Sequence, residues 1–134
     1  MAYILVVDDY FEIAQWIKQI LLQLGHDVEV CLNSGSAKEK LRSQEYDLIF
    51  MDIIMPEPDG LELCKFIREK LPEEKRTVPI IAISGGALSI DARVALSAAS
   101  RYADMIMEKP LAPQDIKKAV AHLLMQRGQG RLEI

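Results

Sequence analysis

The sequence has few of the features that mark secreted, membrane or metal-cluster proteins. It contains only two cysteines, Cys31 and Cys64, and they lack the C-x-x-C spacing of a metal or redox motif. Both lie in apolar patterns, so we expect reduced core thiols in a cytoplasmic protein. No apolar run approaches the roughly 20 residues that a membrane-spanning helix needs. No charged leader precedes the first apolar segment, so no signal peptide is expected.

Positive charge is also scarce. The chain has 16 Lys and Arg against 20 Asp and Glu, which gives a formal net charge of -4. This balance argues against a generally basic surface, and no direct binding to nucleic acid is expected. Half of the residues are apolar and 27% are charged, a composition that excludes disorder. With 134 residues, the chain has the length of one domain with a sizeable core.

Apolar runs of strand length alternate along the chain with segments of helical periodicity. This alternation predicts a doubly wound α/β fold, in which a five-stranded parallel sheet carries five helices on its two faces. The domain is expected over residues 1–127, and residues 128–134 are expected to form a frayed C-terminal tail. The predicted strands are 3–7, 28–32, 48–51, 79–83 and 104–108, and the predicted helices are 13–24, 37–41, 63–71, 89–100 and 116–124.

The single tryptophan and the two histidines of the chain lie outside any functional motif. Trp16 falls at a helically spaced apolar position and is predicted to lie in the core. His26 and His122 have no metal-ligating partner at useful spacing, so both are predicted to be surface residues.

Polar side chains follow four of the predicted strands. Asp8 and Asp9 follow the first strand, Asp52 the third, Ser84 the fourth and Lys109 the fifth. Because the carboxyl ends of parallel strands meet at one edge of the sheet, we expect these side chains to lie close together. Three carboxylates in one cleft repel each other and need a cation or raised pKa values to coexist. Oxygen ligands of this kind suit Mg²⁺.

This combination suits phosphoryl transfer. Lys109 and the Ser84 hydroxyl would complete a site for an anion with three oxygens, that is, a phosphoryl group. Asp52 is the most central carboxylate and could act as the nucleophile that forms an aspartyl phosphate. Mg²⁺ and Lys109 would then offset the charge on the equatorial phosphoryl oxygens.

Each of these residues also has a plainer interpretation. Asp8, Asp9 and Asp52 could cap helices or lie in solvated loops, which are common places for aspartate. Ser84 precedes a glycine and could be an ordinary turn residue. Lys109 could be a solvated lysine. The plain interpretations weaken when the five residues are counted together, because each one falls at the end of a strand.

Other functions of such a sheet fit less well. A phosphatase with an aspartyl nucleophile would need a second acid two residues after Asp52, where the chain has Ile54. A nucleotide-binding protein would need a Gly-rich loop after the first strand. A flavin-binding module would need Ser, Thr or Gly there, because Asp8 and Asp9 would repel its phosphate.

Four short motifs occur in a fixed order over residues 3–124. They are Leu-Val-Val-Asp-Asp at 5–9, Met-Asp-Ile-Ile-Met-Pro at 51–56 with Asp-Gly at 59–60, Ile-Ser-Gly at 83–85, and Glu-Lys-Pro at 108–110. With them the chain resembles the receiver domains of bacterial two-component response regulators. The resemblance implies a flavodoxin-like fold with strand order 2-1-3-4-5 and phosphorylation on Asp52. It also implies Mg²⁺ bound by Asp9, Asp52 and the backbone carbonyl of Ile54, with Asp8 acting through water.

The resemblance further implies a switch and partners. Ser84 would contact the phosphoryl group, Lys109 would pair with a phosphoryl oxygen, and the bond from Lys109 to Pro110 would be cis. The donor would be a sensor histidine kinase or a histidine phosphotransfer protein. Output would be a contact with a downstream protein through the last helix-strand-helix face. The domain would catalyse only its own phosphorylation and dephosphorylation. No DNA-binding module follows the last helix, so we expect a stand-alone regulator or a fragment of a longer protein.

One position departs from the family's pattern. Receiver domains usually have an aromatic residue three places before the lysine, and it rotates as the partner of the switch serine or threonine. Here the position holds Ile106, which is branched at Cβ and has few rotamers. We therefore expect the backbone of residues 84–86, which include two glycines, to carry the conformational change. A third alternative is a receiver-like module that only binds partners, but nothing in the residues favours it, because all five site positions are filled.

Overall fold

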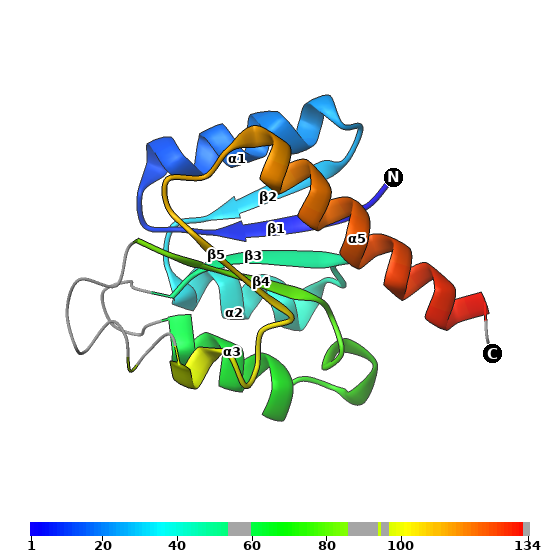
Figure 1. The fold of residues 1–134 in the computed structure, drawn as a ribbon. Coiled ribbons are helices and arrows are strands. Elements are labelled where there is room, and N and C mark those ends of the chain that lie inside the picture. Colours follow the sequence, from blue (N-terminus) through cyan, green and yellow to red (C-terminus); the bar gives the residue numbers. More distant parts are fainter. Residues whose placement is uncertain (54–59, 86–93, 95–96, 133–134) are drawn as a thin grey trace.

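The computed structural model describes residues 1–53, 60–85, 94 and 97–132, with side chains described as far as residue 127. Within them the chain forms three layers, a central five-stranded parallel sheet with helices on both faces (Figure 1). The strand order is β2-β1-β3-β4-β5, which confirms the predicted fold class and topology. The strands are β1 (Tyr3–Val7), β2 (Asp27–Cys31), β3 (Leu48–Asp52), β4 (Ile80–Ser84) and β5 (Met105–Glu108).

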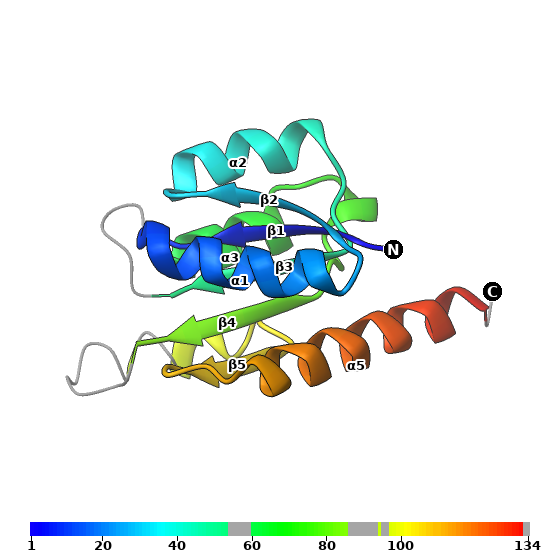
Figure 2. The same ribbon diagram turned by 90° about the horizontal axis from the view of Figure 1, so that it is seen from above.

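The helices divide between the two faces of the sheet (Figure 2). On one face lie α1 (Phe11–Gln23) and α5 (Pro113–Leu132), and on the other lie α2 (Ser34–Ser43) and α3 (Gly60–Glu69). A short 3-10 helix, η1 (Glu73–Lys75), precedes β4. The predicted helix 89–100 falls mostly outside the described residues, but Val94 and residues 97–99 are helical.

Continuous apolar runs place β3 and β4 at the centre of the sheet. Every residue of both strands is buried, as a strand covered on two faces requires. One apolar core packs the sheet against α1 and α5, and a second packs it against α2 and α3. Cys31 and Cys64 are buried in the apolar core, as predicted. Within the described part of the chain, no helix combines the length and the apolar character that crossing a membrane requires.

The edge strand β2 is only partly buried and is held by a polar cluster. The Glu29 carboxylate accepts hydrogen bonds from the hydroxyls of Tyr3 at 3.1 Å and Tyr46 at 2.9 Å, and it pairs with the Lys40 ammonium at 3.2 Å. Burial raises the pKa of Glu29, but hydrogen bonds from Tyr46, Lys40 and Tyr3 outweigh it, so the pKa lies below its ordinary value. In this partly buried edge strand, the side chain of Glu29 thus connects β2 to Tyr3, Lys40 and Tyr46.

Three details differ from the sequence-based expectation. The last helix does not stop near Leu124: α5 continues to Leu132, through residues predicted as a frayed tail. The Arg127 guanidinium at this end donates to the Asp47 carbonyl at 3.2 Å, a tertiary contact that local periodicity does not encode.

Trp16, predicted in the core, is 39% exposed. His26, predicted as a surface residue, is half-buried, and its Nδ1 accepts a hydrogen bond from the Ala2 N–H at 3.0 Å.

Candidate functional site

The carboxyl edge of the sheet gathers the predicted acidic residues. Asp52 is the last residue of β3, Asp8 and Asp9 directly follow β1, and β1 pairs with β3. Carboxylate oxygens of Asp8, Asp9 and Asp52 all lie within 4.8 Å of one another. Asp8 and Asp52 are buried, whereas Asp9 is exposed. The register of the parallel strands therefore produces the carboxylate cluster that the sequence predicts.

Asp8 is fixed by the backbone around it. Its N–H donates to the Cys31 carbonyl at 3.1 Å, and its Oδ1 accepts the Tyr10 N–H at 2.9 Å, just before α1. Its Oδ2 is buried and has no hydrogen-bond partner among the residues that the structure describes. A buried carboxylate oxygen without a hydrogen bond is costly unless a cation compensates its charge.

Lys109 brings the positive charge to this cluster. Its Nζ lies 3.5 Å from Asp8 Oδ2 and 3.5 Å from Asp52 Oδ2. Its backbone N–H donates to the Ser84 carbonyl at 2.8 Å, and the peptide bond from Lys109 to Pro110 is cis. The Lys109 ammonium pairs with two of the three clustered carboxylates, so among the described residues the cluster has more negative than positive charge.

The donor set fits a hard divalent cation. Carboxylate oxygens are the ligands that Mg²⁺ prefers, and the buried Asp8 Oδ2 accepts no hydrogen bond from the described residues, so it could serve as a ligand beside the Lys109 ammonium. The residues that would hold the ion are Asp8, Asp9 and Asp52. Ile54, whose backbone carbonyl was predicted as a further ligand, lies outside the described residues.

The two predicted switch residues lie on neighbouring strands. Ser84 ends β4, is buried, and is in register with Glu108 of β5. Ile106 is partly buried and packs against a small apolar cluster that contains Ile53, Ala82 and Ala99. This cluster links the residue after Asp52 to β4 and to the helical residues 97–99, so it connects the site to the face that was predicted to give output.

Gly60 is a site residue that sequence reasoning missed. It was named only as part of the Asp-Gly motif, but it is the first residue of α3, and its N–H donates to the Ile53 carbonyl at 3.2 Å. A Cβ at this position would overlap the Asp52 carbonyl and come within 2.6 Å of Ile53 Cα. Both neighbours are backbone, so only glycine lets α3 approach the end of β3 this closely.

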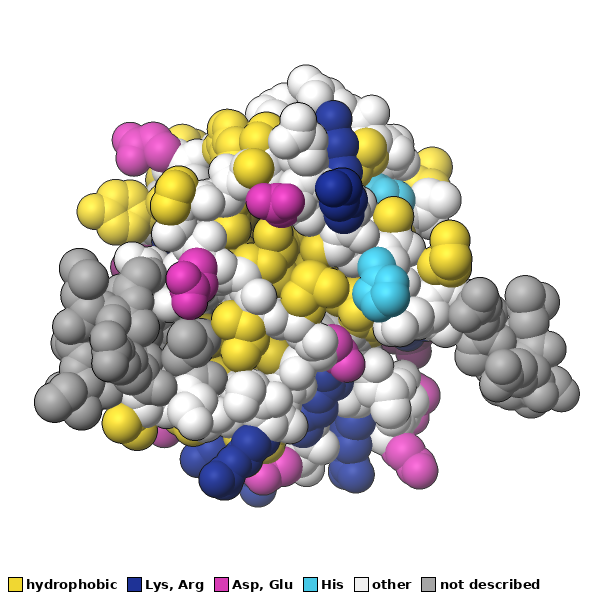
Figure 3. Space-filling model, in the orientation of Figure 1, with side chains coloured by type: hydrophobic (Ala, Val, Ile, Leu, Met, Phe, Trp, Pro, Cys, Tyr) yellow, Lys and Arg dark blue, Asp and Glu magenta, His cyan; other side chains and the backbone are white. Residues whose placement is uncertain are grey.

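A groove adjoins the carboxylate cluster between α1 and the segment that leads into α5. It has a volume of about 480 Å³. Figure 3 shows several hydrophobic side chains exposed on the face of the molecule that α1 and α5 cover. Phe11, near the start of α1, is 57% exposed. The groove is lined by Ile13, Trp16, Gly85, Lys109, Pro110 and Leu111, so Lys109 borders both the groove and the acidic site.

A five-stranded sheet in this order, with acids after β1 and at the end of β3 and a lysine after β5, defines an α/β domain of the receiver type. Residues 4–121 match the family model of the response regulator receiver domain, and the chain belongs to this family.

The chain is similar to several characterised proteins. It is 31% identical, over 90% of its length, to the alkaline phosphatase synthesis transcriptional regulatory protein PhoP of Bacillus subtilis. The signal receiver domain of a histidine kinase from Syntrophus aciditrophicus superposes with a TM-score of 0.83 at 29% identity, covering 94% of this chain and 92% of that one. A CheY-like receiver domain protein from Methanospirillum hungatei gives 0.78 at 28% identity, covering 97% and 98%. The chain spans 48% of the length of PhoP.

Proposed function

We propose that this receiver domain accepts a phosphoryl group on Asp52. The observation that carries the proposal is the convergence on Asp52, at the end of the central buried strand, of two further carboxylates and the Lys109 ammonium. A carboxylate in this setting has a nucleophilic oxygen, a cation for the incoming anion and acidic neighbours that suit a divalent metal.

The chemistry is an in-line displacement. An Asp52 carboxylate oxygen forms the new bond to phosphorus as the bond to the donor's leaving group breaks, and the leaving group departs with that electron pair. Lys109 pairs with a phosphoryl oxygen, and the Ser84 hydroxyl donates to another. Bound at Asp8, Asp9 and Asp52, with the Ile54 carbonyl as a further ligand, Mg²⁺ would neutralise charge on the transferred group. The domain would act only on its own aspartate, in phosphorylation and dephosphorylation.

The donor would be a sensor histidine kinase or a histidine phosphotransfer protein. The groove lined by Trp16 and Leu111 supports this part of the proposal, because it is apolar and opens beside Lys109. A donor that presents a phosphohistidine to Asp52 could place apolar side chains there and over the exposed Phe11. Output would be a contact with a downstream protein.

The switch would start at Ser84. A phosphoryl group adds strong acceptor oxygens, which would draw the Ser84 hydroxyl toward Asp52. Ile106 has few rotamers, so the backbone of residues 84–86 would carry most of the change. A Cβ at Gly85 would meet no atom of the described residues within 4 Å, which is compatible with a change of conformation there. Gly86 lies outside the described residues.

The proposal is tested by mapping the phosphoryl group. The protein is incubated with acetyl phosphate and Mg²⁺, and the adduct is located by intact mass and peptide analysis. We expect one phosphoryl group on Asp52, none in Asp52→Asn, and normal labelling in Asp27→Asn, which removes an exposed carboxylate at the start of β2. Labelling of the Asp52→Asn protein at another residue would refute the assignment.

A further inference from the structure

We propose that Arg68 is a positioning residue for Lys109. It would act at a distance, by fixing the start and the register of β5, the strand that ends next to Lys109. The inference rests on the proposed function, because it needs Lys109 to assist phosphoryl transfer.

The burial of its side chains contributes little to keeping β5 in place. Each of the five residues of β4 is buried, but β5 has only four residues, of which three are half-buried and one is exposed. It is an edge strand and is hydrogen-bonded along one side, to β4. A parallel strand that slips by one residue turns all its side chains to the opposite face. A lysine placed by such a strand therefore needs an anchor other than the apolar core.

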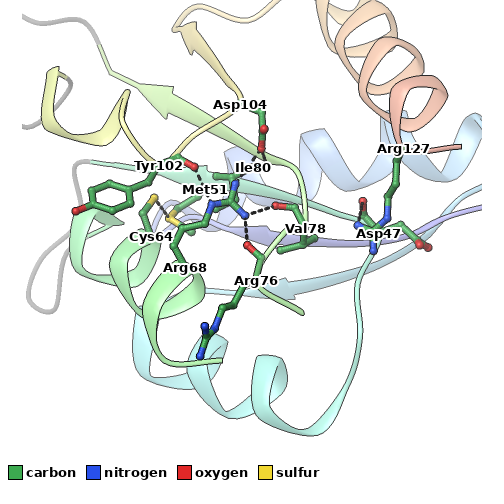
Figure 4. Close-up of polar contacts among 10 residues, drawn as sticks. All are labelled: Asp47, Met51, Cys64, Arg68, Arg76, Val78, Ile80, Tyr102, Asp104 and Arg127. Carbon is green, nitrogen blue, oxygen red and sulfur yellow. Dashed lines mark hydrogen bonds and ion pairs between the residues drawn. The ribbon is translucent and has the colours of Figure 1, made fainter. Parts of the chain in front are cut away.

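Arg68 provides that anchor at the amino end of β5 (Figure 4). From α3, its Nε donates to the Tyr102 carbonyl at 3.0 Å, and its Nη2 pairs with Asp104 Oδ2 at 3.0 Å. Its Nη1 donates to the carbonyls of Val78 at 2.7 Å and Arg76 at 2.5 Å. A single guanidinium thus ties the segment before β4 to the segment before β5.

Asp104 completes the register. Its Oδ2, already paired with Arg68, also accepts the Ile80 N–H at 2.8 Å, and its own N–H donates to the Ile80 carbonyl at 2.8 Å. The first residue of β4 is therefore bonded twice to the residue before β5. At the far end of the strand, the Lys109 N–H donates to the Ser84 carbonyl at 2.8 Å. β5 is therefore hydrogen-bonded to β4 just before its first residue and just after its last residue. The two site residues, Ser84 and Lys109, lie at the carboxyl ends of these strands.

The position of Lys109 is sensitive to small shifts of β5. Its Nζ is 3.5 Å from both Asp8 Oδ2 and Asp52 Oδ2, so a displacement of the strand changes both distances. A misplacement of about 1 Å at a reacting group can cost on the order of 100-fold in rate. Lysine cannot replace Arg68, because it has no planar fork of donors to reach carbonyls in separate segments.

A double-mutant cycle tests the proposal. The initial rate of phosphorylation by acetyl phosphate with Mg²⁺ is measured for Arg68→Lys in the Lys109 protein and in Lys109→Ala, per folded molecule. We expect a loss of roughly tenfold in the Lys109 protein and less than about twofold in Lys109→Ala. Arg101→Lys, the same change at an exposed position in the segment before β5, should leave both rates unchanged. An equal loss in both backgrounds, or no loss, would overturn the proposal.

A second measurement does not depend on phosphorylation. Amide hydrogen exchange of residues 104–108 in the free protein should be about tenfold faster in Arg68→Lys than in wild type. It should be unchanged in Arg101→Lys. If exchange in Arg68→Lys matches wild type, Arg68 does not fix β5 and the inference fails. If wild type gains no phosphoryl group, the proposed function fails, and with it the role of Lys109, while exchange still reports whether Arg68 anchors the strand.

Discussion

The two ends of the sheet differ in how well their charged and polar groups are paired. At the carboxyl end, three carboxylates lie close together, one lysine pairs with two of them, and a buried oxygen of Asp8 has no hydrogen-bond partner among the described residues. At the amino end, donors meet acceptors: Arg68 binds backbone carbonyls and Asp104, and Arg127 binds the Asp47 carbonyl (Figure 4). The amino end is arranged for stability, whereas the carboxyl end keeps charge available for a ligand.

This contrast explains how a small domain can hold repelling charges. Without a bound metal ion, the repulsion among the three carboxylates, which the single Lys109 ammonium offsets only in part, is expected to lower the stability of the fold. Central strands buried on both faces, together with hydrogen bonds at the amino end, offset that cost. The contrast predicts that substitutions at the amino end lose stability, and that removing charge at the carboxyl end does not.

The largest effect on stability is expected from Arg68→Met. The variant loses the ion pair to Asp104 and the hydrogen bonds to three carbonyls, each bond to a charged group being worth about 1.5–3 kcal/mol. Because the side chain is partly exposed, we expect a net loss of about 2–4 kcal/mol in the free energy of unfolding, measured in urea. Arg101→Met, at an exposed position, should change it by less than about 0.5 kcal/mol. Equal losses in the two variants would contradict a stabilising role for the amino end.

A smaller loss is expected from Gly60→Ala, which adds a methyl group where α3 meets the end of β3. The new Cβ overlaps the backbone of Asp52 and Ile53, so α3 must shift, at a cost of about 1–3 kcal/mol. The shift should also slow phosphorylation of Asp52. In the matched control Gly35→Ala, in α2, the contact is with the Asn33 side chain at 3.3 Å, and the change should stay within about 1 kcal/mol. If Gly60→Ala and Gly35→Ala lose the same free energy of unfolding, the close approach of α3 to β3 at Gly60 does not affect stability.

The smallest effect concerns His26 and appears only in how the free energy of unfolding depends on pH. Burial lowers the pKa of His26 below 6.5, the nearby N-terminal amine lowers it further, and Asp47 partly opposes them. The neutral ring accepts a hydrogen bond from the Ala2 N–H. The contribution of this bond to the free energy of unfolding is therefore present above about pH 6.5 and is lost as pH falls through the lower pKa of the folded state.

The test is the free energy of unfolding at about pH 7.5 and about pH 5.5. Wild type should lose up to about 1 kcal/mol more on acidification than His26→Ala, while His122→Ala, at an exposed position of α5, should follow wild type. An identical pH dependence in wild type and His26→Ala would show that this hydrogen bond does not contribute.

The elements that could be predicted from the sequence are those with strong local signals. β1, β3 and β4 are unbroken apolar runs, and α1 ends near Gly25, whose φ of +90° favours glycine. The length of α5 was underestimated, because its last turns follow a residue, Arg127, that is fixed by a tertiary contact to Asp47.

The acidic cluster was predictable because the carboxyl ends of parallel strands converge on one edge. The anchor at Arg68 was not, because its partner Asp104 lies 36 positions away, and in sequence both residues resemble solvated charges. The role of Gly60 was not predictable either, since the clash that requires a glycine arises only when α3 packs against Asp52.

The contrast between the two ends is tested most directly by unfolding wild type and Asp52→Asn in urea, with and without Mg²⁺. Without the metal, we predict that Asp52→Asn is at least as stable as wild type, because one of three mutually repelling carboxylates is gone. With Mg²⁺ at about 100 times its Kd, wild type should gain about 2.7 kcal/mol and Asp52→Asn much less. A metal-free Asp52→Asn protein that is less stable than wild type, and that gains as much from Mg²⁺, would contradict the account.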